Sequence, residues 1–488
     1  SLESSDFNAQ YQAATPHKSN RFSFRPSEVA PHYLAWPRLI DFATKQPFAG
    51  IAEDRRKSLI GIDQEPLRAR MKAYFDPNVT WEKLSTLAPF LTRDLPRFDA
   101  KKARTILLNK ETFSEARLLP FAMRPFDVQW CYYSPVRPLW REPRPEYWSA
   151  YDTGMPTIVS RFNAAKSPEG SPLVFARQLC DYHLMPPNAS VFPLQFKSKE
   201  TYQEEAYGQA SLLEKQQSVV ANLSAAARSY LSSLGLTEPN TNAQTAGLIW
   251  MHSLAIGYSP AYLTENAEGI SQDWPRIPLP KELELLKLSA LLGQQVADLL
   301  ETKTPVKGVT TGTIRPELAQ MGIITSVSGG QLRPEQGDLE ITVGWGHPGK
   351  EGVTMPGKGK LIERDYTLEE VAALEKLLVT GGLTVEQAFD RLGGRTCDLY
   401  LNEKAYWRNV PLNVWNYYIG GYQVIKKWLS YREKEMLGRA LQVEEAREVT
   451  AMIRRIAALV LLEPYLDQNY RAVKAATYKW PLPNNGFS

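Results

Sequence analysis

Residues 344–349 have the spacing Gly-x-Gly-x-x-Gly, with which a backbone turn can hold a pyrophosphate. That chemistry needs a strand before the glycines and an amphipathic helix after them. Residues 339–343 are typical of a short strand, but residues 350–356 contain Gly352 and Pro356 and do not fit such a helix. The segment also nearly matches a P-loop, yet Glu351 stands where a Ser or Thr must bind magnesium. We therefore interpret it as a hairpin loop.

Other catalytic motifs are absent from the sequence or match it only in part. The tetrapeptides Asn-Pro-Pro-Tyr and Asp-Pro-Pro-Tyr, which hold an extruded adenine in amino-methyltransferases, do not occur; residues 185–188 only share their composition. Residues 99–101 have the spacing of a nuclease motif, but such triplets arise often by chance. Three cysteines and five histidines are scattered, which argues against a disulfide framework or a zinc site. We expect no catalytic residues, cofactor or metal in this chain.

A first group of basic residues follows an aromatic segment, residues 124–133. Arg137, Arg141 and Arg144 lie there among prolines, which keep a loop stiff and extended. Guanidinium groups so presented can bind phosphates or the edge of a guanine. The alternative is that Arg124 pairs with Asp127 while the aromatic side chains fill a core.

A second basic group follows the aromatic residues 417–422. Gly420 and Gly421 suit a tight turn or a close backbone approach before a short helix. A locally positive stretch then begins, which suits a phosphate backbone: Lys426, Lys427, Arg432 and Lys434. The alternative is a solvated helix face. A third, weaker group lies in the Gly-rich region and comprises Lys350, Lys358, Lys360 and Arg364.

Composition is compatible with DNA binding but does not decide it. The chain has 488 residues, of which 43% are hydrophobic and 23% charged, the balance of a globular protein. The net charge of +4 is only mildly basic. The longest apolar run, residues 456–462, is too short to cross a bilayer, and residues 1–6 do not resemble a signal peptide. We expect a cytoplasmic protein without a membrane partner.

The elements that must position these groups follow from periodicity. Apolar residues recur at steps of three and four in residues 281–301, which predicts an amphipathic helix. Thr367 and Glu370 have the spacing of a capping box. Further helices are predicted at residues 207–234, 242–257, 367–378 and 384–392, and through most of the tail from 411 to 480. Alternating patterns predict strands within residues 118–133, 157–162, 172–179 and 189–196.

These elements predict an α+β, multi-lobed fold in which two β-containing lobes are separated by helices and followed by a helical C-terminal segment. The domains we expect are an N-terminal segment, a first β-rich lobe, a helical spacer, a second β-rich lobe and the C-terminal segment. Their predicted boundaries are 1–103, 104–205, 206–301, 302–410 and 411–488.

Three segments together resemble a known family. They are the block 124–133; residues 256–262 with 274–280 downstream; and the long run from Asp398 through 405–411 and 420–432 to 454–459 and 469–473. This series is similar to the C-terminal specificity region of type ISP restriction-modification enzymes, and more loosely to that of fused adenine methyltransferase-endonucleases. The resemblance covers most of residues 104–480.

The resemblance implies sequence-specific recognition of double-stranded DNA, which positions the duplex for adenine-N6 methylation and cleavage by methyltransferase and helicase-nuclease parts that this chain lacks. S-adenosylmethionine, ATP and Mg are expected only for those parts. Residues 1–103 would follow the methyltransferase core, either in a shortened enzyme or in a separate specificity subunit. Two alternatives remain open: an S-adenosylmethionine-dependent adenine methyltransferase, complete or partial, and a domain that couples proteins.

Overall fold

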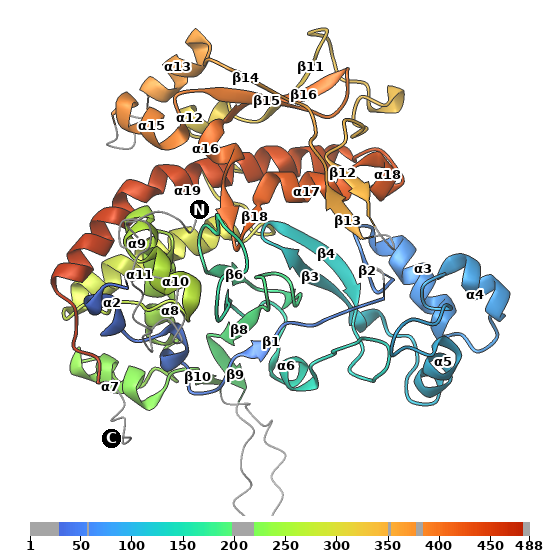
Figure 1. The fold of residues 1–488 in the computed structure, drawn as a ribbon, viewed down its shortest axis with the longest axis horizontal. Helices are drawn as coiled ribbons and strands as arrows, with labels where there is room; N and C mark the ends of the chain where they lie inside the picture. Colours follow the sequence, from blue (N-terminus) through green and yellow to red (C-terminus); the bar gives the residue numbers. More distant parts are fainter. Residues whose placement is uncertain (1–28, 56–57, 198–218, 350–352, 377–383, 482–488) are drawn as a thin grey trace, which may run out of the picture.

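The computed structural model describes residues 29–55, 58–197, 219–349, 353–376 and 384–481. Of the described residues, 41% lie in helices and 19% in strands. The strands form several small sheets separated by helices. The predicted α+β class is therefore confirmed. A β-containing lobe and a helical layer occupy one side of the long helix α19 (Val443–Ala475), and a second β-containing lobe occupies the other (Figure 1).

The first lobe contains two four-stranded sheets. One has the order β2-β4-β3-β7 and the other the order β1-β8-β5-β6. The strands of the first sheet are β2 (Ile60–Gly61), β3 (Leu118–Arg124), β4 (Asp127–Tyr132) and β7 (Leu179–Cys180). Those of the second sheet are β1 (Phe48–Ala49), β5 (Thr157–Ser160), β6 (Val174–Ala176) and β8 (Ser190–Pro193), and a separate pair is formed by β9 (Gln195–Lys197) and β10 (Val219–Ala221).

Four helices accompany the first lobe: α3 (Gln64–Phe75), α4 (Trp81–Leu87), α5 (Ala100–Leu108) and α6 (Pro145–Ala150), with a 3-10 turn at Glu115–Arg117. The strands β1 and β2 precede residue 103, yet they pair with β8 and β4 of the following segment. The described part of residues 1–103 therefore shares its sheets with residues 104–205 and does not form a separate layer.

The helical layer is built around the packing of α8 (Ala243–Gly257) against α11 (Leu283–Leu300), both close to their predicted ranges. The two backbones approach closely because Gly293 has no side chain; a Cβ there would lie 1.7 Å from the carbonyl oxygen of Met251. The remaining helices of the layer are α2 (Pro31–Leu34), a 3-10 turn at Leu39–Phe42, α7 (Ala225–Ser233), α9 (Pro260–Glu265) and α10 (Ala267–Gln272). Residues 207–218 of the predicted helix 207–234 lie outside the described residues. In the rest of that range the prediction is wrong for Val219–Ala221, which form the strand β10, and is confirmed for α7.

The second lobe has a four-stranded sheet of order β11-β16-β15-β14. Its strands are β11 (Ile323–Ser326), β14 (Leu361–Arg364), β15 (Thr396–Tyr400) and β16 (Ala405–Pro411), and its helices are α12 (Pro316–Ala319), α13 (Leu368–Glu375) and α15 (Val385–Leu392), with a 3-10 turn at Pro334–Gln336. The predicted capping box at the start of α13 is confirmed, since Thr367 and Glu370 exchange side-chain-to-backbone hydrogen bonds.

Between the second lobe and the first lie short elements of the C-terminal segment and a two-stranded ribbon (Figure 1). The ribbon pairs β12 (Gly346–Pro348) with β13 (Thr354–Pro356). The other elements are α16 (Leu412–Trp415), β17 (Tyr418–Ile419), β18 (Tyr422–Gln423), α17 (Val424–Arg432) and α18 (Lys434–Leu437).

The predicted strand at residues 339–343 is wrong. Leu339 and Ile341 are buried, as the alternation suggested, but no ladder forms there. Instead, the amide of Thr342 donates to the carbonyl of Leu401, while the carbonyl of Ile341 accepts from the amide of Lys434. The backbone bonds of one short segment go to two different neighbours, so its apolar alternation reflects burial without a sheet.

A buried histidine joins the layers around α19. In His252 of α8, the Nδ1 atom lies 2.7 Å from the hydroxyl oxygen of Ser289, and the Nε2 atom lies 2.7 Å from the carbonyl oxygen of Pro278. Asn469 of α19 donates its amide N–H to the same hydroxyl at 2.9 Å. A neutral imidazole satisfies all of these hydrogen bonds, because Nε2–H donates to the carbonyl of Pro278 and Nδ1 accepts from the hydroxyl of Ser289. Burial lowers the pKa of His252 to about 4.

This pKa predicts acid sensitivity. The unfolded chain binds a proton near the ordinary pKa of 6.5, whereas the folded chain resists protonation until about 4, so acid favours unfolding. The contribution of His252 is fully present above pH 6.5 and falls by up to about 3 kcal/mol as the pH drops through 4. Denaturant unfolding at a series of pH values measures it. The neutral variant His252→Gln should show a weaker pH dependence than the wild type; equal pH dependence would contradict the assignment.

Candidate nucleic-acid interface

The loop 137–144 between β4 and α6 presents the first basic group. Arg137 and Arg144 both pair with Glu142, at 2.7 and 3.6 Å, and Arg141 pairs with Asp54 at 3.3 Å. Three guanidinium groups thus share two carboxylates, which leaves the loop positive. Surface ion pairs of this kind contribute little to stability and exchange easily for a phosphate.

Two cations that the sequence analysis missed lie beside this loop. Arg97, which precedes α5, and Lys102, in its first turn, line a groove of about 640 Å³ together with Arg137. Asp94 and Asp99 line the same groove, so its charge is mixed. Arg97 and Lys102 are far from Arg137 in sequence, and local pattern offers no signal that joins them.

The second basic group lies on and after α17. Lys426 and Lys427 are half-buried, and the amine of Lys427 lies 4.5 Å from the centre of the Tyr431 ring. Lys434 is exposed and forms an ion pair with Glu340 at 2.8 Å. These three lysines remain at the surface, where a phosphate backbone could reach them.

Arg432 requires a correction, because the structure places it in the interior. Its side chain is 3% exposed and pairs with Asp127 of β4, whose side chain is 1% exposed, at 2.9 Å. The guanidinium also lies 3.7 Å from the centre of the Trp428 ring. Burial against an aromatic ring and a carboxylate removes Arg432 from any DNA surface and makes it a link between α17 and the first lobe. Asp127 thus pairs with Arg432, and Arg124 with Asp181 at 2.6 Å, in place of the suggested Arg124–Asp127 pair.

The third group lies between β13 and β14. Lys358 and Lys360 are exposed, and the Lys360 amine lies 4.4 Å from the centre of the Tyr400 ring. Arg364, at the end of β14, instead pairs with Glu370 and Asp398 within the lobe. Lys350 lies outside the described residues.

Glu433 brings the second and third groups together. Its carboxylate accepts hydrogen bonds from the amides of Gly344 and Trp345, at 2.9 and 2.8 Å. Trp345 also packs against Trp415, with ring centres 5.3 Å apart. The segment before Lys358 is thereby fixed to the segment that carries Lys426 and Lys434.

The same hydrogen bonds decide how the glycine-rich segment is used. The amides of Gly344 and Trp345 bind a carboxylate of this chain, and the strand β12 follows where a phosphate-binding turn needs a helix. The expected hairpin is confirmed by the pairing of β12 with β13. These residues therefore do not fit a dinucleotide or S-adenosylmethionine.

The first basic group stays apart from the other two along β4. Asp127, the partner of Arg432, begins this six-residue strand, and the loop 137–144 follows its far end. At about 3.3 Å per residue the two ends of β4 are separated by roughly 17 Å. The structure therefore links the second and third basic groups through Glu433, whereas the first group follows the end of β4 opposite to Asp127.

A further basic residue, Lys166, was missed by the sequence analysis. Its amine lies 3.9 Å from the centre of the Tyr422 ring in β18, and Arg124 approaches the same ring to 5.5 Å. Burial and the charge of Arg124 lower the pKa of Lys166. The only sequence signal was indirect: the loop that holds Lys166 meets the Gly420–Gly421 turn, at which a close backbone approach was predicted.

The close approach at this turn is confirmed. Gly421 has φ of 75°, and a Cβ there would lie 2.5 Å from Cβ of Lys166. The amide of Gly421 donates to the carbonyl of Glu169 at 2.7 Å. The C-terminal segment is thereby fixed to the first lobe next to Lys166.

Four of these lysines carry charge that the described residues do not compensate. Lys166, Lys358, Lys360 and Lys426 lie beyond ion-pair distance of every carboxylate in the described part of the chain. By contrast, the arginines of the loop 137–144 and Lys434 each have an acidic partner. Lysines without an acidic partner are the simplest phosphate contacts that the surface offers.

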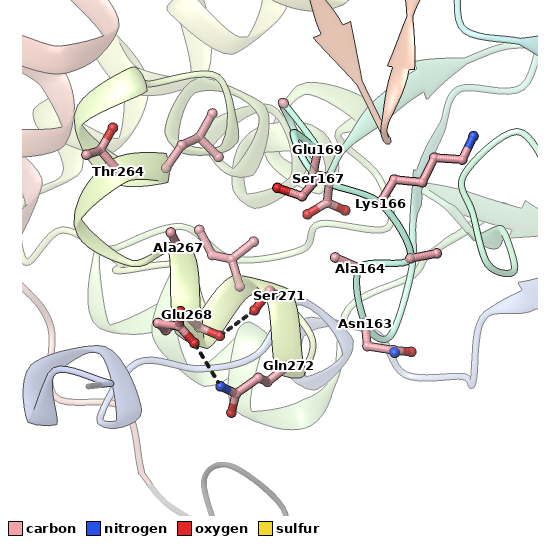
Figure 2. Close-up of a pocket in the computed structure, with 14 residues that line it drawn as sticks. Asn163, Ala164, Lys166, Ser167, Glu169, Thr264, Ala267, Glu268, Ser271 and Gln272 are labelled. Carbon is pink, nitrogen blue, oxygen red and sulfur yellow. Dashed lines mark hydrogen bonds between the residues drawn. The ribbon is translucent and has the colours of Figure 1, made fainter. Parts of the chain in front are cut away.

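A cavity of about 900 Å³ lies between the loop that holds Lys166 and the helices α9 and α10 (Figure 2). Its acidic residues already have partners. Glu169 binds the buried guanidinium of Arg161, and the carboxylate of Glu268 accepts a hydrogen bond from the side-chain amide of Gln272. Within the described ranges, no three His, Cys, Asp or Glu side chains gather as possible metal ligands. None of the helices described is long and apolar enough to cross a membrane.

Comparison with known proteins supports one family. The family model described as the type ISP C-terminal specificity domain matches residues 45–456. No curated protein matches the chain.

Three solved structures share its fold. They are the DrdV–DNA complex, with a TM-score of 0.50 at 13% identity; a nuclease-deletion mutant of the type ISP restriction-modification enzyme LlaGI in complex with a DNA substrate mimic, with 0.50 at 12%; and the ATP-dependent type ISP restriction-modification enzyme LlaBIII bound to DNA, with 0.53 at 12%. The matches cover 88%, 91% and 91% of this chain, but only 36%, 35% and 24% of those chains. The chain thus spans about a quarter to just over a third of their length.

The buried ion pair of Arg432 with Asp127 predicts a strong coupling between the C-terminal segment and the first lobe. Arg432→Met leaves the Asp127 carboxylate buried without a counter-ion, and we expect the free energy of unfolding to fall by about 3–5 kcal/mol. Adding Asp127→Asn to that variant should recover part of the loss. Urea unfolding of the wild type, both single variants and the double variant measures the coupling. Strictly additive effects would contradict a direct pair, and Arg137→Met is the control for loss of an exposed arginine.

Proposed function

The chain belongs to the family of type ISP C-terminal specificity domains, and on that premise we propose that it recognises a specific sequence in double-stranded DNA. In this proposal it holds the duplex in register within a cytoplasmic restriction-modification enzyme. Adenine-N6 methylation and cleavage are carried out by methyltransferase and helicase-nuclease parts, which use S-adenosylmethionine, ATP and Mg. A base must leave the stack to be methylated, at a cost of a few kcal/mol, so the duplex has to be held firmly.

One observation in this chain supports the proposal best. Lys358, Lys360 and Lys426 are uncompensated, and Glu433 fixes their two segments to each other. Lys166 adds a fourth such charge where the C-terminal segment meets the first lobe. Phosphate contacts supply affinity and position, while contacts to base edges supply specificity. The arginines Arg137, Arg141 and Arg144 form a second, separate positive surface that the same duplex could reach.

The alternative of a methyltransferase in this chain finds no support in the residues present. The turn at Gly344 is bonded to Glu433 and leads into β12, so it does not offer its amides to a cofactor. The sequence also lacks the tetrapeptide that holds an extruded adenine.

The coupling alternative is favoured by one feature of α11. Leu288 and Leu291 are 59% and 62% exposed, one helical turn apart on the same side. Such a pair suits contact with another protein part. Exchange of this chain between two enzymes separates the roles: transfer of the recognised DNA sequence supports recognition, whereas retention of the original sequence supports coupling.

The proposal predicts weaker and less salt-dependent binding on charge neutralisation. The variant Lys358→Gln, Lys360→Gln, Lys426→Gln should bind duplex DNA more weakly, and the slope of log affinity against log salt should shrink by about 0.9 for each phosphate that the variant no longer neutralises. Fluorescence anisotropy with a labelled duplex at several salt concentrations measures both quantities.

A matched control neutralises three exposed lysines elsewhere: Lys83→Gln, Lys110→Gln, Lys281→Gln. It alters net charge equally and should keep the wild-type slope. Wild-type binding that does not depend on salt would overturn the proposed function. Equal slopes for the two triple variants would overturn the assignment of these lysines.

A further inference from the structure

The ribbon β12–β13 has two unlike faces. In its register His347 is opposite Met355, and both side chains are exposed; Val353 shares their face and is also exposed. On the opposite face Gly346 and Thr354 are buried, whereas Pro348 and Pro356 are exposed. The described residues of the ribbon include no carboxylate. One face is therefore only partly packed on the protein, through Gly346 and Thr354, and the other offers an imidazole and apolar groups to the exterior.

The ribbon is held tightly at its base. Gly346 packs on α17 so closely that a Cβ would lie 2.1 Å from the carbonyl oxygen of Ser430. The residues just before the ribbon are bonded to Glu433, and the amide of Gly357 just after it donates to the carbonyl of Trp345 at 2.7 Å. Both strands of the ribbon are thus fixed at its base, which keeps the orientation of His347 and Met355 defined. A fixed orientation is what discrimination between bases requires.

The size of the ribbon fits the major groove. Two strands lie about 4.8 Å apart, and with side chains the ribbon remains within the groove width of about 12 Å. Three residues of strand extend for about 10 Å, which is close to the groove depth of about 8.5 Å.

We propose that the outward face of the β12–β13 ribbon reads base edges in the major groove, with His347 as the hydrogen-bonding group and Met355 as the apolar contact. This inference rests on the proposed function and assigns the reading element within it. An imidazole can donate to or accept from a base edge, and a thioether side chain suits the methyl group of thymine.

The neighbouring lysines are placed to support this reading. Lys358 follows the end of β13 by two residues, a span of at most about 7 Å of extended chain. Lys426 belongs to α17, on which the ribbon packs. Phosphates on either side of an occupied groove would meet these two charges, so one docking geometry uses both the ribbon and the lysines.

Selection of bound duplexes from a randomised DNA library tests the inference. The wild-type chain should enrich a motif, and the variant His347→Ala, Met355→Ala should lose the preference at one or more adjacent positions. For the selected motif we expect the affinity of the variant to fall by about ten-fold, while its affinity for unrelated DNA and its salt slope stay unchanged. The control Leu288→Ala, Leu291→Ala removes two exposed apolar side chains from α11 and should keep the wild-type motif.

The outcomes separate this inference from the proposed function. A double variant that enriches the wild-type motif with equal preference at every position overturns the inference and leaves DNA recognition standing. A wild-type chain that binds duplexes with salt dependence but without sequence preference overturns both the inference and sequence-specific recognition. A wild-type chain that binds no duplex overturns both. Equal melting temperatures of the wild type and the double variant establish that a weakened preference comes from the altered side chains.

Discussion

The complete burial of the middle of α19 is the constraint on which the other contacts depend. Every residue from Arg455 to Leu461 is buried, so both lobes and the helical layer must cover this helix. The one charge in that run, Arg455, binds backbone carbonyls at the end of α11, including those of Asp298 at 2.8 Å and Leu299 at 3.2 Å. Its guanidinium satisfies orphan carbonyls at a helix end, and the helix end in turn compensates a buried charge. The position of α19 relative to the helical layer is thereby determined.

Arginine and lysine have different roles in this molecule. Arg432 joins α17 to the first lobe through Asp127, and Arg391 joins α15 to α19 through Glu463 and Asp467. The planar, multiply donating guanidinium suits such connections, whereas an ammonium group tends to remain hydrated at the surface. Lys358 and Lys426 are two of the lysines that have no acidic partner in the described part of the chain. Net charge is a poor guide to the DNA surface because many of the basic residues hold the lobes together.

Local pattern predicted the longest helices and most strands between residues 118 and 196. The helices α8 and α11, the capping box of α13 and the strands β3 and β4 all follow from spacing within a few residues. Prediction failed where partners are distant. Residues 339–343 alternate like a strand but bond to two separate segments, and Arg432 lies in a basic stretch but pairs with a residue 305 positions away. Lys166 gave only the indirect signal of the Gly420–Gly421 turn, because its significance depends on Tyr422, which belongs to another part of the chain.

Periodicity was sufficient for the α+β class, the resemblance of three segments indicated the family, and composition showed which kinds of residue are available for phosphate contacts. Which cations are free depended on the fold in three dimensions. A guanidinium and an ammonium in the same basic stretch look equivalent until burial and pairing distinguish them, as Arg432 and Lys426 show. The glycine-rich segment is a similar case: its spacing suggested an anion site, and the fold filled that site with Glu433 of the same chain. In both cases residues distant in sequence determined the outcome, because charge compensation depends on distance in space and not on distance along the chain.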